Sequence, residues 1–197
     1  MALSLYFVRH GETAWSISGR HTGRTDVPLS EEGESRARLL EPRLAQVRFA
    51  AVLTSPRQRA RRTCELAGLA AGARIEPDLA EWDYGDYDGM RSAEIHGTRP
   101  GWNLFRDGCP GGESPAQVAA RADGLIARLR SMDGAVALFS HGHFGRVLAV
   151  RWAGLPVADG QSLLLDTASV GILTYEHGNP AAPAIGTWNF PATGRIS

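Results

Sequence analysis

The sequence contains no lysine, and all 21 residues of the Lys+Arg count are arginine. A Walker-type phosphate-binding loop needs its lysine, and an enzyme that forms a Schiff base needs one too. Both classes of protein are therefore excluded. Arginine is nevertheless the better phosphate ligand, because its planar guanidinium donates two parallel hydrogen bonds to one anion.

Cysteine and long apolar segments are scarce as well. Cys64 and Cys109 lie far apart and form no CxxC pair, which disfavours a disulfide framework or a zinc knuckle and indicates a reducing compartment. The longest apolar runs, such as 135–139, are far too short to span a bilayer, and residues 1–8 lack the basic start of a signal peptide. We therefore expect a cytoplasmic protein without a membrane partner.

Neither sign of charge is in excess, because the formal net charge is +0. This balance gives no reason to expect a nucleic-acid partner. The 197 residues, 43% of them hydrophobic and 21% charged, have an ordinary globular composition. Their number suits one core, and no repeat or linker divides the chain. We expect a single domain over residues 1–197.

Predicted strands alternate with predicted helices along the chain. Short apolar runs predict strands, and serine caps before apolar positions at helical spacing predict helices. Residues 9–28 read as a loop, and the glycine-rich region between 85 and 112 reads as loops with short helices. This order predicts an α/β fold with a mostly parallel sheet and helices on both faces. The strands are expected at 3–8, 50–54, 135–139, 163–165, 170–175 and 184–188. The first helix is expected to begin at Ser30 and to kink or end at Pro42. The other helices are expected from Ser55-Pro56 to near Gly68, from Ser114-Pro115 to about 132, and over 144–152.

The last predicted strand, 184–188, has two interpretations. It could be an exposed edge through which a homodimer pairs, or an edge that other parts of the chain cover.

Two His-Gly turns follow predicted strands. Arg9-His10-Gly11 comes directly after the first strand, and Ser140-His141-Gly142 directly after the strand at 135–139. Ligands of such sheets bind outside the carboxyl ends of the strands, so we expect both turns at one rim. A single His-Gly turn is more often structural. His141 and His143 could also bind zinc with His10 or His21, but an HxH without an obvious third ligand is a weak metal signal. We expect no metal and no cofactor.

Hydrolysis of a phosphate monoester without metal needs cations, a nucleophile and a proton donor. Arg9, Arg59 and His141 can supply donors and positive charge, and a neutral His10 can attack phosphorus. Glu81, or less readily Asp83, can protonate the leaving oxygen. The alternatives are structural: residues 57–62 could be a solvated arginine-rich helix face, and the acidic stretch 81–88 a solvated loop or weak cation site that lacks the EF-hand pattern.

Six motifs, in order and spread over nearly the whole chain, make the sequence resemble the histidine phosphatase superfamily, also called the phosphoglycerate-mutase-like family. They are Arg9-His10-Gly11-Glu12-Thr13; Gly23-Arg24-Thr25-Asp26-Val27-Pro28-Leu29-Ser30 with Gly33; Ser55-Pro56 with Arg59-Ala60 and Thr63; Leu79-Ala80-Glu81 through Gly85 to Asp88-Gly89; Gly112-Glu113-Ser114; and Ser140-His141-Gly142.

The resemblance implies a three-layer α/β/α sandwich and a role for each matching residue. His10 would be the phosphorylated nucleophile and Glu81 the proton donor. The residues that would hold the phosphoryl oxygens are Arg9, Arg59 and His141, and those that would line the substrate pocket are Thr22, Gly23 and Tyr84.

Finer features resemble the branch that holds actinobacterial acid phosphatases and the fungal sedoheptulose bisphosphatase. In that branch His143 and Arg146 would contact the part of the substrate that is not transferred, and His21 lies in the matching pocket segment 19–23. The features are Trp15-Ser16, residues 19–23, residues 81–87, Trp102, residues 106–109, and His141-Gly142-His143 with Arg146.

We therefore expect a metal-independent histidine acid phosphatase that hydrolyses a small phosphorylated metabolite, a sugar phosphate or bisphosphate, through phosphohistidine. A pocket that desolvates Glu81 beside other carboxylates would keep it protonated and produce a mildly acidic optimum. The alternatives are a phosphoglycerate mutase and a non-catalytic phospho-ligand-binding module. Mutases of this family usually have Asn at the position of Ser16, a longer chain, and lysines that this sequence lacks.

Overall fold

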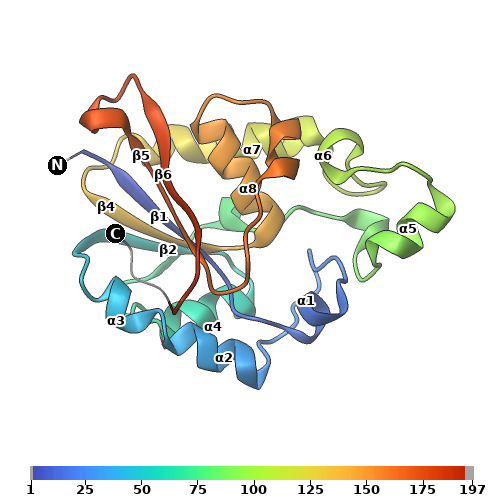
Figure 1. Ribbon diagram of the computed structural model, residues 1–197, viewed down its shortest axis with the longest axis horizontal. Helices are drawn as coiled ribbons and strands as arrows, with labels where there is room; N and C mark the ends of the chain where they lie inside the picture. The colour runs from blue at the N-terminus through green and yellow to red at the C-terminus, as the bar shows by residue number, and fades with distance from the viewer. Residues whose placement is uncertain (1, 194–197) are drawn as a thin grey trace.

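The computed structural model describes residues 2–193, and its centre is a mixed sheet. In the described part of the chain the sheet has six strands in the order β3-β2-β4-β1-β5-β6 (Figure 1). The first four pair in parallel and the last two antiparallel. The strands are β1 (Ser4–Arg9), β2 (Phe49–Thr54), β3 (Arg74–Ile75), β4 (Ala135–Ser140), β5 (Val170–Tyr175) and β6 (Pro183–Phe190).

Helices cover both faces of this sheet. Figure 1 shows α2, α3 and α4 on one face and α7 and α8 on the other, which confirms the predicted α/β/α layers. Their bounds are α2 (Glu31–Arg38), α3 (Glu41–Leu44), α4 (Gln58–Leu66), α7 (Pro115–Leu129) and α8 (Gly142–Trp152).

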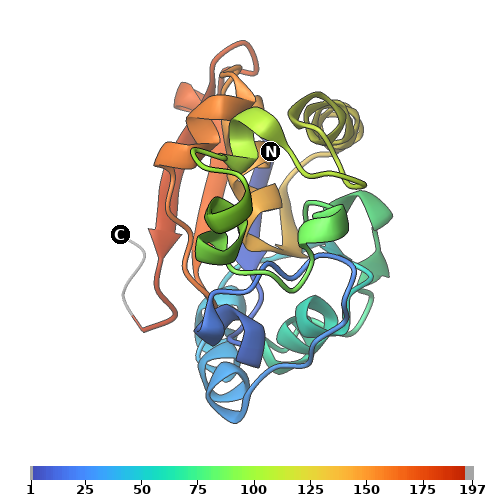
Figure 2. The same cartoon turned by 90° about the vertical axis from the view of Figure 1, so that its right-hand side faces the viewer.

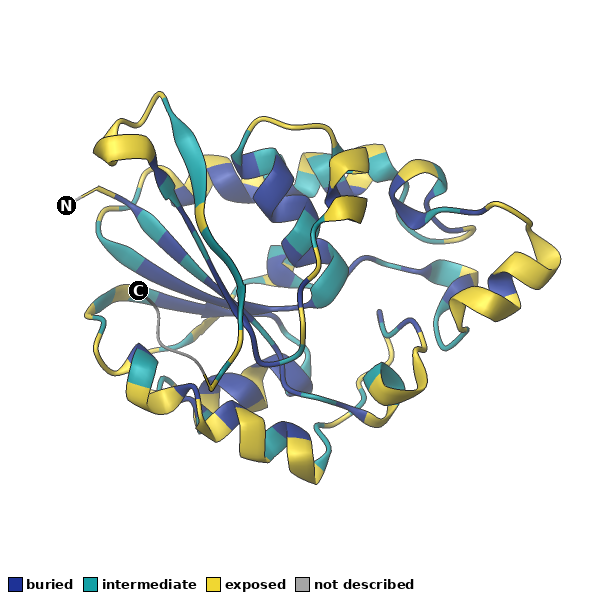
Figure 3. Cartoon of the chain, in the orientation of Figure 1, coloured by how far each residue is buried: buried dark blue, intermediate teal, exposed yellow. Residues whose placement is uncertain are grey.

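Neighbouring residues of the central strands pack into two separate hydrophobic cores, one on each face of the sheet. In β1, Phe7 packs into the core under α7 and α8, whereas Val8 packs into the core under α2 to α4. Leu138 and Phe139 divide in the same way in β4. Because side chains alternate along a strand, a sheet buried on both faces needs continuous apolar runs. Figure 3 shows these buried strands between helices whose outer faces are exposed.

Serine caps start two helices as predicted. The Ser30 side chain accepts a hydrogen bond from Gly33 N at 3.0 Å, and the Ser114 side chain accepts one from Gln117 N at 3.3 Å. The helix expected from Ser55-Pro56 begins later, at Gln58. The Ser55 hydroxyl contacts a ring nitrogen of His141 at 2.7 Å, so it is engaged in a tertiary contact at the point where the helix was expected to begin.

Four other features differ from the predictions. Residues 163–165 form no strand, because the Leu164 and Leu165 carbonyls accept hydrogen bonds from the Trp188 and Arg9 side chains instead of from a backbone ladder. The loop 9–28 contains a short helix, α1 (Ala14–Ser18), with a capping box. The first helix ends at Arg38, and Pro42 lies in the first turn of the separate α3. The strand β3 has only two residues, too few for a sequence pattern.

Most of the segment between β3 and α7 lies at the carboxyl end of the parallel strands. Figure 2 looks onto this end, where short helices surround the loops that follow β1 and β4. These are η1 (Pro77–Leu79), η2 (Gly85–Tyr87), α5 (Ser92–Thr98), α6 (Leu104–Asp107) and η3 (Val157–Ser162), while η4 (Glu176–Gly178) lies in the β5–β6 connection.

Gly145 lets α8 pack directly on β1. A Cβ atom there would lie 2.4 Å from a Phe7 ring carbon and 2.9 Å from a Leu165 methyl. We expect Gly145→Ala to lower the free energy of unfolding by about 1–3 kcal/mol, because the core would be overpacked.

Gly97 of α5 is the matched control. It is exposed, and a Cβ atom would meet nothing within 4 Å. Gly97→Ala should raise the free energy of unfolding by up to about 1 kcal/mol through helix propensity. Urea denaturation of both variants checks this, and equal midpoints would contradict the packing argument.

Candidate active site

Parallel pairing of β1 and β4 brings the two His-Gly turns together. Arg9 is in register with Ser140, and His10 N donates to the Ser140 carbonyl at 3.0 Å. The ring centroids of His10 and His141 are therefore 5.2 Å apart. The predicted common rim exists, and it holds both histidines in contact.

The His10 ring is held with one nitrogen free. Its Nδ1 lies 2.7 Å from the Gly11 carbonyl, which can only accept, so Nδ1 carries the proton and Nε2 the lone pair. Burial, followed by the charges of Arg59 and Arg9, lowers the pKa of His10 well below its usual 6.5. A neutral imidazole with a free Nε2 is the form that can attack phosphorus.

The loop after His10 is packed against α2 and α4. Gly11 N donates to the Thr63 hydroxyl at 3.0 Å, and that hydroxyl donates to the Arg59 carbonyl at 2.7 Å. A Cβ atom on Gly33 would lie 2.1 Å from the Glu12 carbonyl oxygen. The glycine at position 33 is thus required by the close approach of the helix to the nucleophile loop.

His141 lies beneath His10 and is fully buried. Arg59 Nε donates to its Nδ1 at 3.2 Å, so the proton is on Nε2, which donates to the Ser55 hydroxyl at 2.7 Å. Burial, then Arg59 and His10, lowers the pKa of His141 well below 6.5. The second histidine is therefore also neutral in this structure.

Arg59 is fully buried, and its only ion pair in the described chain is a long one with Asp26. Its NH1 donates to the Thr25 carbonyl at 3.0 Å, and its NH2 donates to the Thr22 and Gly23 carbonyls at 2.9 and 3.2 Å. The nearest oxygen of Asp26 is 3.8 Å away. The guanidinium thus keeps its positive charge beneath the histidines.

Arg9 contributes a second guanidinium. It donates to the Leu165 carbonyl, and its buried Nε has no hydrogen-bond partner within residues 2–193. Burial lowers the pKa of both Arg9 and Arg59, and the Glu81 charge opposes that shift. A buried donor without a partner costs about 1–3 kcal/mol, so an anion oxygen bonded to Arg9 would be stabilising.

Glu81 is held by backbone amides. Its carboxylate accepts from Trp82 N at 2.8 Å, Phe144 N at 2.7 Å and His143 N at 3.1 Å. The last two amides belong to the first turn of α8, whose dipole favours a negative group. Arg9 and Arg59 are its charged neighbours, and Asp83 and Glu113 line one hollow together with it.

Asp83, the other candidate acid, faces away. Its carboxylate contacts Arg24 at 2.6 Å and accepts from Gly85 N at 3.1 Å. It lines a hollow with Gly23 and Arg24 that Glu81 also borders, but it does not line the pocket that contains His10. Glu81 is therefore the acid that the fold places beside His10.

These groups border a pocket of about 100 Å³. Three predicted site residues do not line it. Arg59 and His141 are fully buried beneath the pocket. Gly23 is connected to the site only through the hydrogen bond that its carbonyl accepts from Arg59. The sequence prediction missed Ser16, Arg20, Gly142 and Leu165. Arg20 could have been predicted, because it directly precedes the predicted site residue His21. No local sequence pattern indicates that Leu165 lines the pocket. The lining residues are Arg9, His10, Ser16, Arg20, His21, Thr22, Glu81, Tyr84, Gly142, His143, Arg146 and Leu165.

Aromatic side chains form the wall opposite Arg9. The Tyr84 hydroxyl lies 2.6 Å from His143 Nδ1, and the His21 ring lies 4.8 Å from the Tyr84 ring. Burial lowers the pKa of His21 to about 4 and that of His143 well below 6.5. This wall is uncharged near neutral pH.

Arg146 is fixed at the pocket's edge. Its Nε donates to the Gly160 carbonyl at 2.8 Å and its NH2 to the Gln161 carbonyl at 2.7 Å. Its guanidinium lies 4.6 Å from the centroid of the Phe105 ring. The cation is therefore held in one position.

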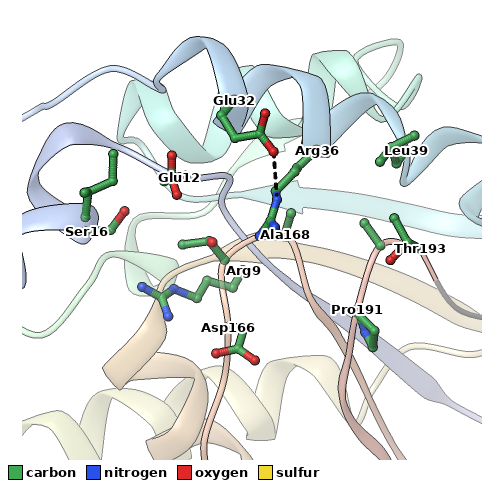
Figure 4. A pocket seen from close by; sticks show the side chains of 13 residues that line it. Arg9, Glu12, Ser16, Glu32, Arg36, Leu39, Asp166, Ala168, Pro191 and Thr193 are labelled. Carbon is green, nitrogen blue, oxygen red and sulfur yellow. Dashed lines mark hydrogen bonds and ion pairs between the residues drawn. The ribbon is translucent and has the colours of Figure 1, made fainter.

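A larger hollow of about 520 Å³ adjoins the pocket and shares Arg9 and Ser16 with it (Figure 4). It lies between α1, α2, the turn 166–168 and residues 191–193, and neither His10 nor Glu81 lines it. The reactive groups thus belong to the smaller pocket.

Within residues 2–193 the structure has neither a metal-binding cluster nor a membrane-spanning helix. No group of three or more His, Cys, Asp or Glu side chains is arranged to hold a metal ion there. No helix in that range has the length and apolar character needed to cross a membrane.

Neutral His10 thus lies beside two buried guanidiniums at the carboxyl end of the parallel strands, with the charge and the free nitrogen that attack on a phosphate ester would require. Residues 5–188 match the model of the histidine phosphatase superfamily (branch 1), and the chain belongs to this superfamily.

Named relatives include phosphatases and also probable phosphoglycerate mutases, such as one of Photorhabdus laumondii that is 31% identical over 89% of this chain and 86% of its own length. An acid phosphatase of Mycobacterium tuberculosis is 43% identical, over 95% of this chain and 94% of its own length. Sedoheptulose 1,7-bisphosphatase of Saccharomyces cerevisiae is 32% identical, over 90% of this chain and 89% of its own. The solved structure of a mycobacterial glucosyl-3-phosphoglycerate phosphatase has a TM-score of 0.84 and 29% identity, over 96% of this chain and all of that one.

The buried histidines make stability depend on pH. In the folded protein the pKa values of His10, His21, His141 and His143 lie below 6.5, whereas the unfolded chain has ordinary values near 6.5. Below pH 6.5 the unfolded state binds more protons, so stability is fully present above that pH and is lost as pH falls. Each of these histidines lowers the free energy of unfolding by up to about 1.4 kcal/mol for each pH unit below 6.5.

Urea midpoints at pH 7, 6 and 5 measure this loss. His143→Gln should weaken the pH dependence, and the same change at the exposed His177 should leave it unaltered. Midpoints that do not change with pH would contradict the neutral state of these histidines.

Proposed function

We propose that this protein is a metal-independent phosphomonoesterase that forms phosphohistidine at His10. The observation that carries the proposal is the free Nε2 of a neutral His10 beside the guanidiniums of Arg9 and Arg59. We assign this activity to one domain, residues 1–197, acting in the cytoplasm without a cofactor. The phosphatase relatives support the reaction class.

In the first step His10 Nε2 attacks phosphorus, an N–P bond forms, and the ester P–O bond breaks. Arg9, whose buried Nε has no partner in the described chain, donates to the phosphoryl oxygens, and the positive charge of Arg59 stabilises them from behind His141. A dianion bound near these two guanidiniums would offset their attraction for the Glu81 carboxylate and favour its protonation. Glu81 then gives this proton to the leaving alkoxide.

In the second step a water oxygen attacks phosphorus and the N–P bond breaks. Glu81, now ionised, takes the proton of the water as a general base. Its three amide donors stabilise the carboxylate between the two steps. Phosphate leaves and His10 returns to its neutral form.

The substrate is small and carries a second anionic or hydroxyl-rich part. A pocket of about 100 Å³ accommodates the phosphoryl group and little more, so the remainder extends out of it past Ser16, Arg20, His143 and Arg146, which also line it. Two guanidiniums at this outer part suit a second phosphate or a carboxylate. A sugar phosphate or bisphosphate meets these conditions, in agreement with the names of the relatives.

Phosphate release from sugar phosphates, bisphosphates, phosphoglycerates and an aryl phosphate, with EDTA present, tests the reaction. His10→Ala should reduce turnover by about 10³-fold or more, because the covalent route is lost. Quenched wild type should hold acid-labile phosphohistidine. His177→Gln is the control and should keep full activity. Phosphoryl transfer between phosphoglycerates that exceeds release would indicate a mutase, and phosphate binding without turnover a binding module.

The outer cations should determine substrate preference. Arg146→Gln should raise KM about 10- to 100-fold for a bisphosphate, because a charged hydrogen bond is lost, and change the KM of an aryl phosphate little. Arg20→Gln should act in the same direction, and the exposed Arg61→Gln is the matched control. Equal effects on both substrates would contradict contact with a second anionic group.

A further inference from the structure

Asp88 holds a loop from a distant part of the chain. Its Oδ1 accepts from Gly23 N at 2.7 Å, and its Oδ2 accepts from Thr25 N at 3.0 Å and from the Thr25 hydroxyl at 2.7 Å. Hydrogen bonds to an ionised acceptor are about twice as strong as neutral ones. The proposed mechanism does not use this carboxylate.

The same loop faces Arg59 with its carbonyls. The Thr22 and Gly23 carbonyls accept from NH2, and the Thr25 carbonyl accepts from NH1. The Thr22 carbonyl and the Gly23 N–H belong to one planar peptide unit. That unit is bonded to Asp88 through its N–H and to Arg59 through its C=O, so its orientation links the two side chains.

Arg59 has no other strong anchor for its terminal nitrogens. The guanidinium is buried, and Asp26 lies too far away, at 3.8 Å, for a hydrogen bond. If the peptide units of residues 22–25 turned, NH1 and NH2 would lose their acceptors and the Nε–H would no longer point at His141. The direction of Arg59 thus depends on what orients these peptide units.

We propose that Asp88 is a positioning residue for Arg59: it orients the peptide units of residues 22–25 so that their carbonyls hold the guanidinium with its Nε–H on His141, where its positive charge acts on the phosphoryl group. The role in catalysis depends on the proposed function, whereas the aiming of Arg59 does not. A carboxylate placed directly on Arg59 would neutralise it. With peptide units in between, the arginine is held and its charge remains available to phosphate.

A double-mutant cycle separates this role from simple bracing of the fold. Asp88→Asn should lower kcat/KM and orthophosphate affinity about 10- to 100-fold in the wild type. In the Arg59→Ala background the same change should cost less than about threefold, because nothing remains to be aimed. Asp86→Asn is the matched control, since Asp86 lies two residues away and is exposed. Equal losses in both backgrounds, or equal losses at positions 86 and 88, would overturn the proposal.

A second readout does not depend on activity. The Arg59 Nε–H resonance, assigned by its absence in Arg59→Ala, should exchange with solvent faster in Asp88→Asn than in Asp86→Asn. Unchanged exchange would overturn the positioning role even if phosphate release falls. A wild type that neither binds nor releases phosphate, yet shows the faster exchange, would contradict only the proposed function.

Thr25 provides a milder test if Asp88→Asn does not fold. Thr25→Ala removes one of the three bonds to Asp88 and keeps the Thr25 carbonyl on Arg59. We expect a loss of orthophosphate affinity of about two- to fivefold, restored by Thr25→Ser, which keeps the hydroxyl. A loss that serine does not restore would contradict the proposal.

Discussion

The parallel pairing of β1 with β4 is the constraint on which the site depends. One backbone hydrogen bond, from His10 N to the Ser140 carbonyl, places two histidines from opposite halves of the chain in ring contact. Gly145 admits α8 against Phe7 of β1, so this helix packs closely on the paired strands. The first turn of the same helix donates to Glu81. Sheet, helix and proton donor are thus parts of one packing arrangement.

The site concentrates positive charge that the fold neutralises only in part. Arg59 is held by backbone carbonyls, by His141 and by a long ion pair with Asp26, and Arg9 keeps a buried donor without a partner in the described chain. The neighbouring histidines stay neutral, because burial and the arginine charges disfavour their protonation. Such an arrangement is unfavourable for the empty protein and favourable for a phosphate dianion, which is how a binding site differs from a stabilising core.

Distance from phosphorus divides the residues into two groups with different constraints. Near His10 the groups are held by the backbone: the Gly11 carbonyl, the amides of α8 and the carbonyls of residues 22–25. Farther out, Arg146 lies over Phe105 and binds carbonyls of η3, a part of the fold built from short helices and loops. The inner part is therefore fixed by main-chain contacts, and the outer part by contacts with loops and short helices.

The sequence by itself determined the layers of the fold, because they follow from local periodicity and caps such as Ser30 and Ser114. It also predicted which turns end on the catalytic rim, since parallel strands share one carboxyl edge. Only the tertiary structure decided that Glu81 and not Asp83 faces His10, that Arg20 reaches the pocket, and that residues 163–165 supply carbonyls instead of a strand. These outcomes depend on contacts between segments far apart in the chain, such as Leu165 with Arg9 or Asp88 with Gly23. No local pattern encodes them, because the direction of a side chain in a loop is set by partners that only folding brings near.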